Sequence, residues 1–120
     1  MYLLWGLRMG MCKHIGMVIK VKPEKLKLYR ELHADQHNGV RDLLSKYNIS
    51  KLCIFLHKLD DGNYYLFGSY EYIGDEYEKD MARLAVEPRN IAWLSETDEC
   101  QIPLNGEKGW AQMEQVYYNK

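Results

Sequence analysis

The spacing of hydrophobic residues along the chain changes from a strand pattern to a helix pattern and back. Residues 13–21 are rich in β-branched side chains and end before Pro23, which predicts a buried strand. Pro23 suits the first turn of a helix because its ring fixes φ near the helical value. Apolar side chains at spacings of three and four then predict one helix over residues 23–47, which Gly39 loosens or bends.

A hairpin follows this helix. Residues 50–57 and 64–72 show a strand pattern, and the Asp-Asp-Gly-Asn sequence at residues 60–63 predicts the tight turn between them. The remaining expected elements are a second helix from about residue 75 to Pro88, a shorter helix over residues 90–96, a long loop over residues 98–109 and a last strand over residues 112–118.

This order of elements, β-α-β-β-α-β, predicts an α+β fold. It is typical of a ferredoxin-like sandwich, in which the helices cover one face of an antiparallel sheet. The strands are too apolar on both alternations for the other face of the sheet to meet water. Two such sheets packed face to face across a two-fold axis would bury that surplus, so we expect a homodimer that forms a dimeric α+β barrel.

The length of the chain, 120 residues, has room for one domain with one hydrophobic core. We expect this domain to span residues 12–120 and residues 1–11 to be an N-terminal extension. The extension is apolar but shorter than the ~20 residues that cross a bilayer. It also lacks the basic start and the cleavage site of a signal peptide. We therefore expect no association with a membrane.

Charge and cysteine content narrow the choice of partner. Sixteen Lys and Arg residues balance seventeen Asp and Glu residues with no long run of one sign, so nucleic acid is not an expected partner. A small neutral or polar ligand fits this balance better. Cys12, Cys53 and Cys100 are widely spaced and form no Cys-x-x-Cys motif, which favours reduced thiols in a cytoplasmic protein.

Tyr29, His33 and His37 follow one another at intervals of four, which places them on one ridge of the predicted helix. His33 is the candidate proton carrier, because an imidazole with an ordinary pKa of ~6.5 can give or take a proton near neutral pH. The alternative is a histidine that only fills the core or the helix surface. We expect no metal, because the HExxH context is missing, and no cofactor, because no nucleotide-binding motif is present.

Aromatic residues supply further candidates for ligand contact. Trp93 and Trp110 flank the long loop, and an indole ring stacks well on the apolar face of a sugar. Tyr47, at the end of the predicted first helix, could also reach a ligand. Each of these side chains can instead fill the core, and the sequence leaves both interpretations open.

Four segments taken together resemble the L-rhamnose mutarotase family in their order and spacing. These segments are residues 29–34, 67–82, 93–104 and 113–118. The resemblance covers about residues 12–118. It implies a dimeric ferredoxin-like barrel that interconverts the α and β anomers of L-rhamnose, or of a related L-6-deoxyhexose, without a cofactor.

The resemblance also implies roles for single residues. The general acid/base of the family falls on His33, and a substrate-binding tyrosine falls on Tyr29. The family usually has a pair of tryptophans where this chain has Trp93 followed by Leu94, and Trp-Pro where this chain has His37-Asn38. The substrate-binding candidates are therefore Tyr29, Trp93, Tyr47 and His37. The departures at positions 94, 37 and 38 bear on the identity of the sugar more than on the reaction.

Two other functions remain open at this point. One is a cofactor-independent or heme-using monooxygenase, because the same barrel carries many chemistries. The other is a sugar-binding homologue that has lost activity, for which the altered tryptophan and Trp-Pro positions are the motive. If the chain is a mutarotase, removal of His33 should slow anomer exchange strongly, and removal of His37 much less.

Overall fold

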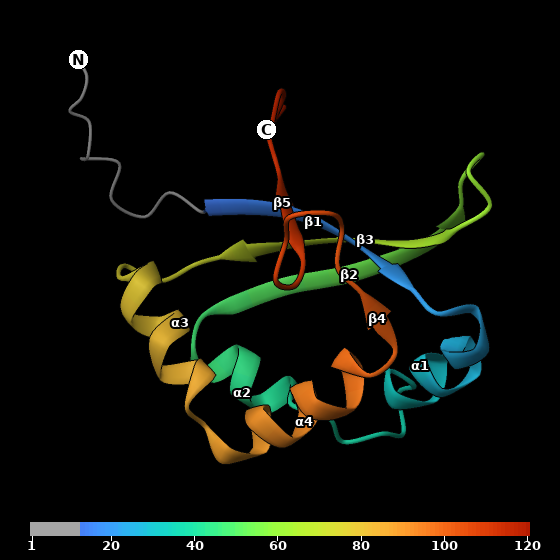
Figure 1. Cartoon of the computed structure of the whole chain (residues 1–120). Coiled ribbons are helices and arrows are strands. Elements are labelled where there is room, and N and C mark those ends of the chain that lie inside the picture. The colour runs from blue at the N-terminus through green and yellow to red at the C-terminus, as the bar shows by residue number, and fades with distance from the viewer. Residues whose placement is uncertain (1–12) are drawn as a thin grey trace.

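The computed structural model describes residues 13–120, and the expected N-terminal extension at residues 1–11 lies outside the described residues. Strands of the described part form one antiparallel sheet in the order β2-β3-β1-β4, with β5 also paired to β1. The strands are β1 (Lys13–Val21), β2 (Ile49–Lys58), β3 (Tyr64–Tyr72), β4 (Gln101–Ile102) and β5 (Ala111–Met113). The sheet is curled, and the expected α+β fold is confirmed (Figure 1).

The helices lie together on one face of this sheet (Figure 1). They are the short 3-10 helix η1 (Pro23–Lys25), α1 (Leu26–Leu32), α2 (Arg41–Lys46), α3 (Tyr77–Ala85) and α4 (Pro88–Asp98). Pro23 and Pro88 each stand at the start of a helical segment, where the missing N–H group has no helical partner to lose. No helix within residues 13–120 is long and apolar enough to cross a membrane.

The hairpin prediction is confirmed. β2 and β3 pair antiparallel through eight residue pairs, from Ile49 with Tyr72 to Lys58 with Tyr64. Gly62, in the connecting turn, has a φ of +86°. A residue with a side chain would be strained in this conformation. One irregularity interrupts the ladder between Ser50 and Cys53, where Lys51 has a φ of +54°. Such a bulge redirects the side chains beside it.

The single helix expected over residues 23–47 is wrong. α1 ends at Leu32, and a loop over residues 33–40 precedes α2. Gly39 has a φ of +53°, which a continuous right-handed helix excludes. Arg41 Nη2 donates to the carbonyl oxygens of His33 at 3.2 Å and Ala34 at 3.3 Å, so these carbonyls find a partner without the missing turns.

Other element boundaries also differ from expectation. The helix expected over residues 90–96 is longer and runs over Pro88–Asp98, while the loop at residues 98–109 contains the short β4. The last strand was expected over residues 112–118, but β5 ends at Met113. Its ladder with β1 stops at the pair of Gly16 with Met113, and the rest of the chain leaves the sheet (Figure 1).

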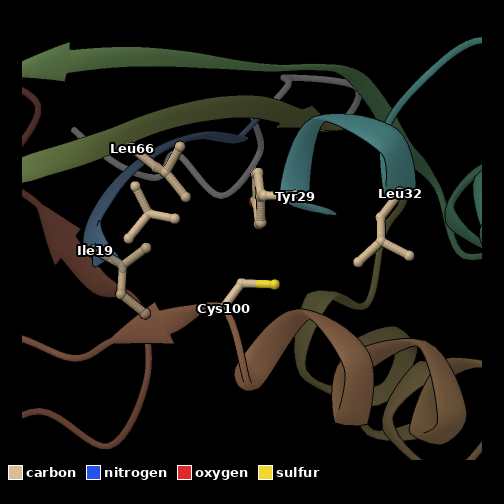
Figure 2. Close-up of a cluster of buried hydrophobic side chains, with 6 residues drawn as sticks. Ile19, Tyr29, Leu32, Leu66 and Cys100 are labelled. Carbon is tan, nitrogen blue, oxygen red and sulfur yellow. The ribbon is translucent and has the colours of Figure 1, made fainter. Parts of the chain in front are cut away.

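The main core lies between the sheet and the helices. Figure 2 shows Ile19 and Leu66 from the strands opposite Tyr29 and Leu32 from α1, with Cys100 between them. Cys100 is fully buried, and the four other side chains are at most 6% exposed. Burying an aliphatic side chain of this size contributes about 1.5–3 kcal/mol to stability. This packing therefore fixes α1, and with it the start of the loop, against the sheet.

The opposite face of the sheet carries apolar side chains that are only half-buried or are exposed in the described chain. Ile54 and Leu56 pack against the core, so Phe55, between them on β2, points to the other face. Phe55 is 66% exposed and pairs across the strands with Phe67, which in turn pairs with Val18. We refer to Phe55, Phe67 and Val18 as the open-face patch.

A buried polar network joins β3 to α3. The hydroxyl of Tyr72 and the side-chain amide of Asn48 both donate to Asp80 Oδ2, the second at 2.9 Å. The Tyr72 hydrogen bond, more than any other contact, lowers the pKa of Asp80 below its ordinary value of 3.8. The carboxylate is therefore charged in the folded protein at neutral pH, although Asp80 is only 7% exposed.

We predict that Tyr72→Phe lowers the free energy of unfolding by about 1.5–3 kcal/mol at neutral pH, the usual contribution of a hydrogen bond to a charged group. Chemical denaturation measures it. The pKa of Asp80 is lower in the folded than in the unfolded protein. The network therefore stabilises the folded state at pH values above 3.8, and this contribution is lost as the pH falls below that value. The difference between the two proteins should shrink accordingly. Tyr64→Phe, on the same strand, should change little, and an equal loss in both variants would refute the role of the network.

Candidate active site

A cavity of about 540 Å³ lies where the loop over residues 33–40 meets α2, β2 and α4. Ligand-binding cavities of proteins commonly have volumes of about 300–1,000 Å³. Its polar lining includes His33, His37 and Arg41, its apolar lining includes Leu44, Leu52 and Ile54, and Trp93 lies at the loop side. The lining combines titratable groups with an apolar wall, which suits a small ligand that is polar on one side only.

His33 is held at the end of α1 by Tyr29. The two rings stack with their centroids 4.2 Å apart, and His33 Nδ1 lies 2.9 Å from the Tyr29 carbonyl oxygen. A carbonyl can only accept, so Nδ1 carries the proton and Nε2 of the neutral ring is a free base. Burial lowers the pKa of His33 below 6.5, and this outweighs the opposing effect of the Tyr29 carbonyl. His33 is therefore neutral, and able to accept a proton, near neutral pH.

Trp93 brings the two histidines of the loop to one side of the cavity. Its ring meets His33 edge-on at a centroid distance of 5.1 Å and lies 5.6 Å from the ring of His37. Gly39 lies beside the same indole, where a Cβ would make ordinary van der Waals contact with it. His37 Nδ1 accepts a hydrogen bond of 3.1 Å from the Gly39 N–H group.

Two arginines that the sequence reasoning missed hold the loop in place. Arg89, one turn before Trp93 on α4, forms two hydrogen bonds with the Asp42 carboxylate, at 2.8 and 2.9 Å, and a third of 3.0 Å with the Gly39 carbonyl oxygen. Paired bonds of this kind fix geometry as well as charge. Arg41 holds the other end of the loop through the carbonyls of His33 and Ala34. In the sequence, the one feature that indicated a loop at this place was the Asn38-Gly39 pair, a typical loop dipeptide.

The remaining aromatic candidates lie away from this cavity. Tyr29 is 6% exposed, and its hydroxyl accepts a hydrogen bond of 3.4 Å from Gln101. Burial raises the pKa of Tyr29 to about 12. Tyr47 donates to Glu87, and Trp110 packs against the main core. A role in substrate binding for Tyr29 or Tyr47 stays a prediction, while His33, His37 and Trp93 line one cavity.

The candidate site does not include a cluster of metal-binding side chains. Within residues 13–120, no three His, Cys, Asp or Glu side chains gather in a group that could hold a metal ion. The functional groups in its lining are the two imidazoles, the Arg41 guanidinium and the Trp93 indole, together with the side chains of Asp35, Ser45, Lys51 and Cys53. Such a set can move a proton at a polar ligand and hold the apolar face of that ligand.

Comparison with solved structures supports the fold. The chain superposes on an L-rhamnose mutarotase from Formosa agariphila with a TM-score of 0.66 and 18% identity, covering 90% of this chain and 99% of the other. A nipsnap family protein of unknown function from Agrobacterium tumefaciens gives 0.62 and 14%, covering 93% and 94%. A proposed antibiotic biosynthesis monooxygenase from Nitrosomonas europaea gives 0.52 and 16%, covering 89% and 100%.

Comparison of the sequence identifies the family. No curated protein matches the chain significantly. The family model that describes L-rhamnose mutarotase, however, matches residues 14–119, a span that contains every strand and helix described above except the first residue of β1. The chain therefore belongs to the L-rhamnose mutarotase family.

Proposed function

We propose that this protein interconverts the α and β anomers of L-rhamnose or of a related L-6-deoxyhexose. The observation that carries the proposal is the Nε2 of His33, which has no hydrogen-bond partner within residues 13–120, at a cavity of about 540 Å³. A mutarotase needs a group that can take a proton from one sugar oxygen and return it to another, and a neutral imidazole does this near neutral pH. The family match supports this class of reaction.

The proposed reaction conserves atoms and electrons. His33 Nε2 takes the proton of the anomeric hydroxyl, and the electron pair of that O–H bond forms the carbonyl at C1. The bond between C1 and the ring oxygen breaks, with its electron pair left on the ring oxygen, to which His33 returns the proton. Rotation about the C1–C2 bond and the reverse sequence then give the other anomer. No oxidant, reductant or cofactor enters this sequence.

The apolar wall supports a 6-deoxy sugar as the substrate. Leu44, Leu52 and Ile54 line the side of the cavity formed by α2 and β2. A methyl group placed against them replaces water, which favours binding by about 0.8 kcal/mol per buried carbon. A hydroxymethyl group at the same place would lose hydrogen bonds to water without finding a partner. L-rhamnose, L-fucose and L-lyxose are the sugars to compare, since L-lyxose has no carbon at this position.

We also propose that the protein is a homodimer in which the open-face patch of each copy is covered by the other. The patch lies on the sheet face that no helix covers (Figure 1). Contiguous apolar side chains on such a face are typical of association surfaces. A cytoplasmic location fits the two described cysteines, Cys53 and Cys100, which are free thiols.

The first prediction concerns His33. His33→Ala should slow anomer exchange by about 10²–10⁴-fold, the usual effect of losing a general acid/base, because no other described group replaces its Nε2. Saturation-transfer NMR on L-rhamnose measures the exchange rate, and the melting temperature shows whether the fold is kept. Arg30→Ala, an exposed change on the same helix, is the control and should keep the parent rate. A folded His33→Ala protein with the parent rate would disprove the mechanism.

The second prediction concerns pH. Because His33 acts as a base in its neutral form, the exchange rate should rise as pH increases through the His33 pKa, which burial places below 6.5. The nearby positive charge of Arg41 acts in the same direction as burial. Above the pKa of His33, the exchange rate should stay constant through neutral pH. This rise should disappear in His33→Ala, and a midpoint above 6.5 would contradict the description of the site.

The third prediction concerns assembly. Phe55→Asp places a charge in the open-face patch and should convert the dimer to a monomer, because a buried unpaired carboxylate is costly. Sedimentation velocity at micromolar concentration should give twice the chain mass of 14.2 kDa for the parent and that mass for the variant. Val86→Asp, at a position 70% exposed beside α3, is the matched control and should remain a dimer. A monomeric parent would rule out this proposal.

A further inference from the structure

The two histidines that line the cavity contact opposite kinds of backbone group, a carbonyl at His33 and an N–H group at His37. His33 Nδ1 lies 2.9 Å from the carbonyl oxygen of Tyr29, which can only accept a hydrogen bond. His37 Nδ1 lies 3.1 Å from the backbone nitrogen of Gly39, whose N–H group can only donate. The proton of a neutral imidazole sits on the nitrogen opposite to the one that accepts. The structure therefore assigns His33 the Nδ1–H tautomer and His37 the Nε2–H tautomer.

These tautomers leave complementary atoms for a ligand. Nε2 of His33 is a lone-pair acceptor, and Nε2–H of His37 is a donor. Within residues 13–120, neither Nε2 atom has a hydrogen-bond partner in the protein. Both side chains line the same cavity, and both rings lie beside Trp93, at centroid distances of 5.1 and 5.6 Å. A sugar in the cavity would thus meet one base and one fixed donor.

We infer that His37 is a second catalytic residue, whose Nε2–H donates a hydrogen bond to the sugar oxygen that becomes negative while His33 Nε2 holds the proton. This inference rests on the proposed function. His37 gives up no proton in the step: the proton moves from the anomeric hydroxyl to His33 and then to the ring oxygen. The donor stabilises the ring oxygen during the interval in which that oxygen holds the electron pair of the broken bond.

The orientation of the His37 ring is set by contacts with the backbone of its own loop. The Gly39 N–H group donates to the ring, Gly39 has a φ of +53°, and Arg89 holds the carbonyl of that same residue at 3.0 Å. A donor that is already aimed before the substrate binds needs no reorganisation during the reaction, which is the condition under which such donors contribute most.

The tautomers can be read directly by NMR. A two-bond ¹H–¹⁵N correlation spectrum, recorded at a pH where both imidazoles are neutral, separates a protonated ring nitrogen from a bare one. His33 should show a protonated Nδ1 and a bare Nε2, and His37 the reverse. Spectra of His33→Ala and His37→Gln assign the signals. A protonated Nδ1 on His37 would overturn the inference, whatever the activity of the protein.

Kinetics then test the role of the donor. His37→Phe keeps a ring but removes the donor, and it should lower kcat for L-rhamnose by up to about 10²-fold, the loss typical of one such donor, with a smaller change in KM. His37→Gln places an amide N–H near the position of Nε2 and should recover most of the rate. Gln36→Ala, an exposed change in the same loop outside the cavity lining, is the control for a disturbed loop and should keep the parent kcat.

Each outcome of the kinetic test decides one question. Equal kcat values for His37→Phe and the parent, a loss confined to KM, or a His37→Gln rate no higher than that of His37→Phe would overturn the inference. A parent that exchanges no sugar anomers would instead end the proposed function, and the catalytic role of His37 with it. In that case opposite tautomers in the spectra would still show that the donor and acceptor pair exists.

Discussion

The contact between Tyr29 and His33 is the constraint on which the candidate site depends. The Tyr29 side chain is part of the main core, packed with Leu32 and Cys100 between the sheet and the helices (Figure 2). Its ring supports the imidazole of His33, and its carbonyl takes the Nδ1 proton of that imidazole. Tyr29 cannot move without opening the core, so the fold itself sets the orientation and the tautomer of His33. The core and the chemistry are thus joined through a single residue.

The sequence predicted the first three strands well, and the last part of the sheet and the first helical region poorly, for a physical reason. Hydrophobic spacing reports which residues face the core, and the three long strands follow it closely. The same spacing continues through residues 33–40, where contacts from distant residues decide the conformation: Arg89 comes from α4, and Arg41 from beyond the loop. His33 and Trp93 could be chosen as site residues from sequence because they lie in the matching segments of the resembled family. The donor role of His37 depends on its contact with Gly39, which no spacing encodes.

The departures from the resembled family fall on different parts of the structure. Leu94 is 43% exposed and lies outside the lining of the cavity. His37 and Asn38 stand where the family usually has Trp-Pro, and here they provide the loop that carries a second imidazole into the cavity. The monooxygenase alternative shares only the fold, at a TM-score of 0.52, whereas the family match over residues 14–119 favours the mutarotase.

If this protein catalyses anomer exchange, saturation transfer between the two anomeric protons of L-rhamnose will reveal it. When one anomeric signal is saturated, a catalyst carries the saturation to the other within the relaxation time of the protons, whereas a protein that only binds the sugar does not. We expect the parent protein, without added metal or cofactor, to transfer saturation at a rate proportional to its concentration. Transfer no faster than in buffer alone would contradict it.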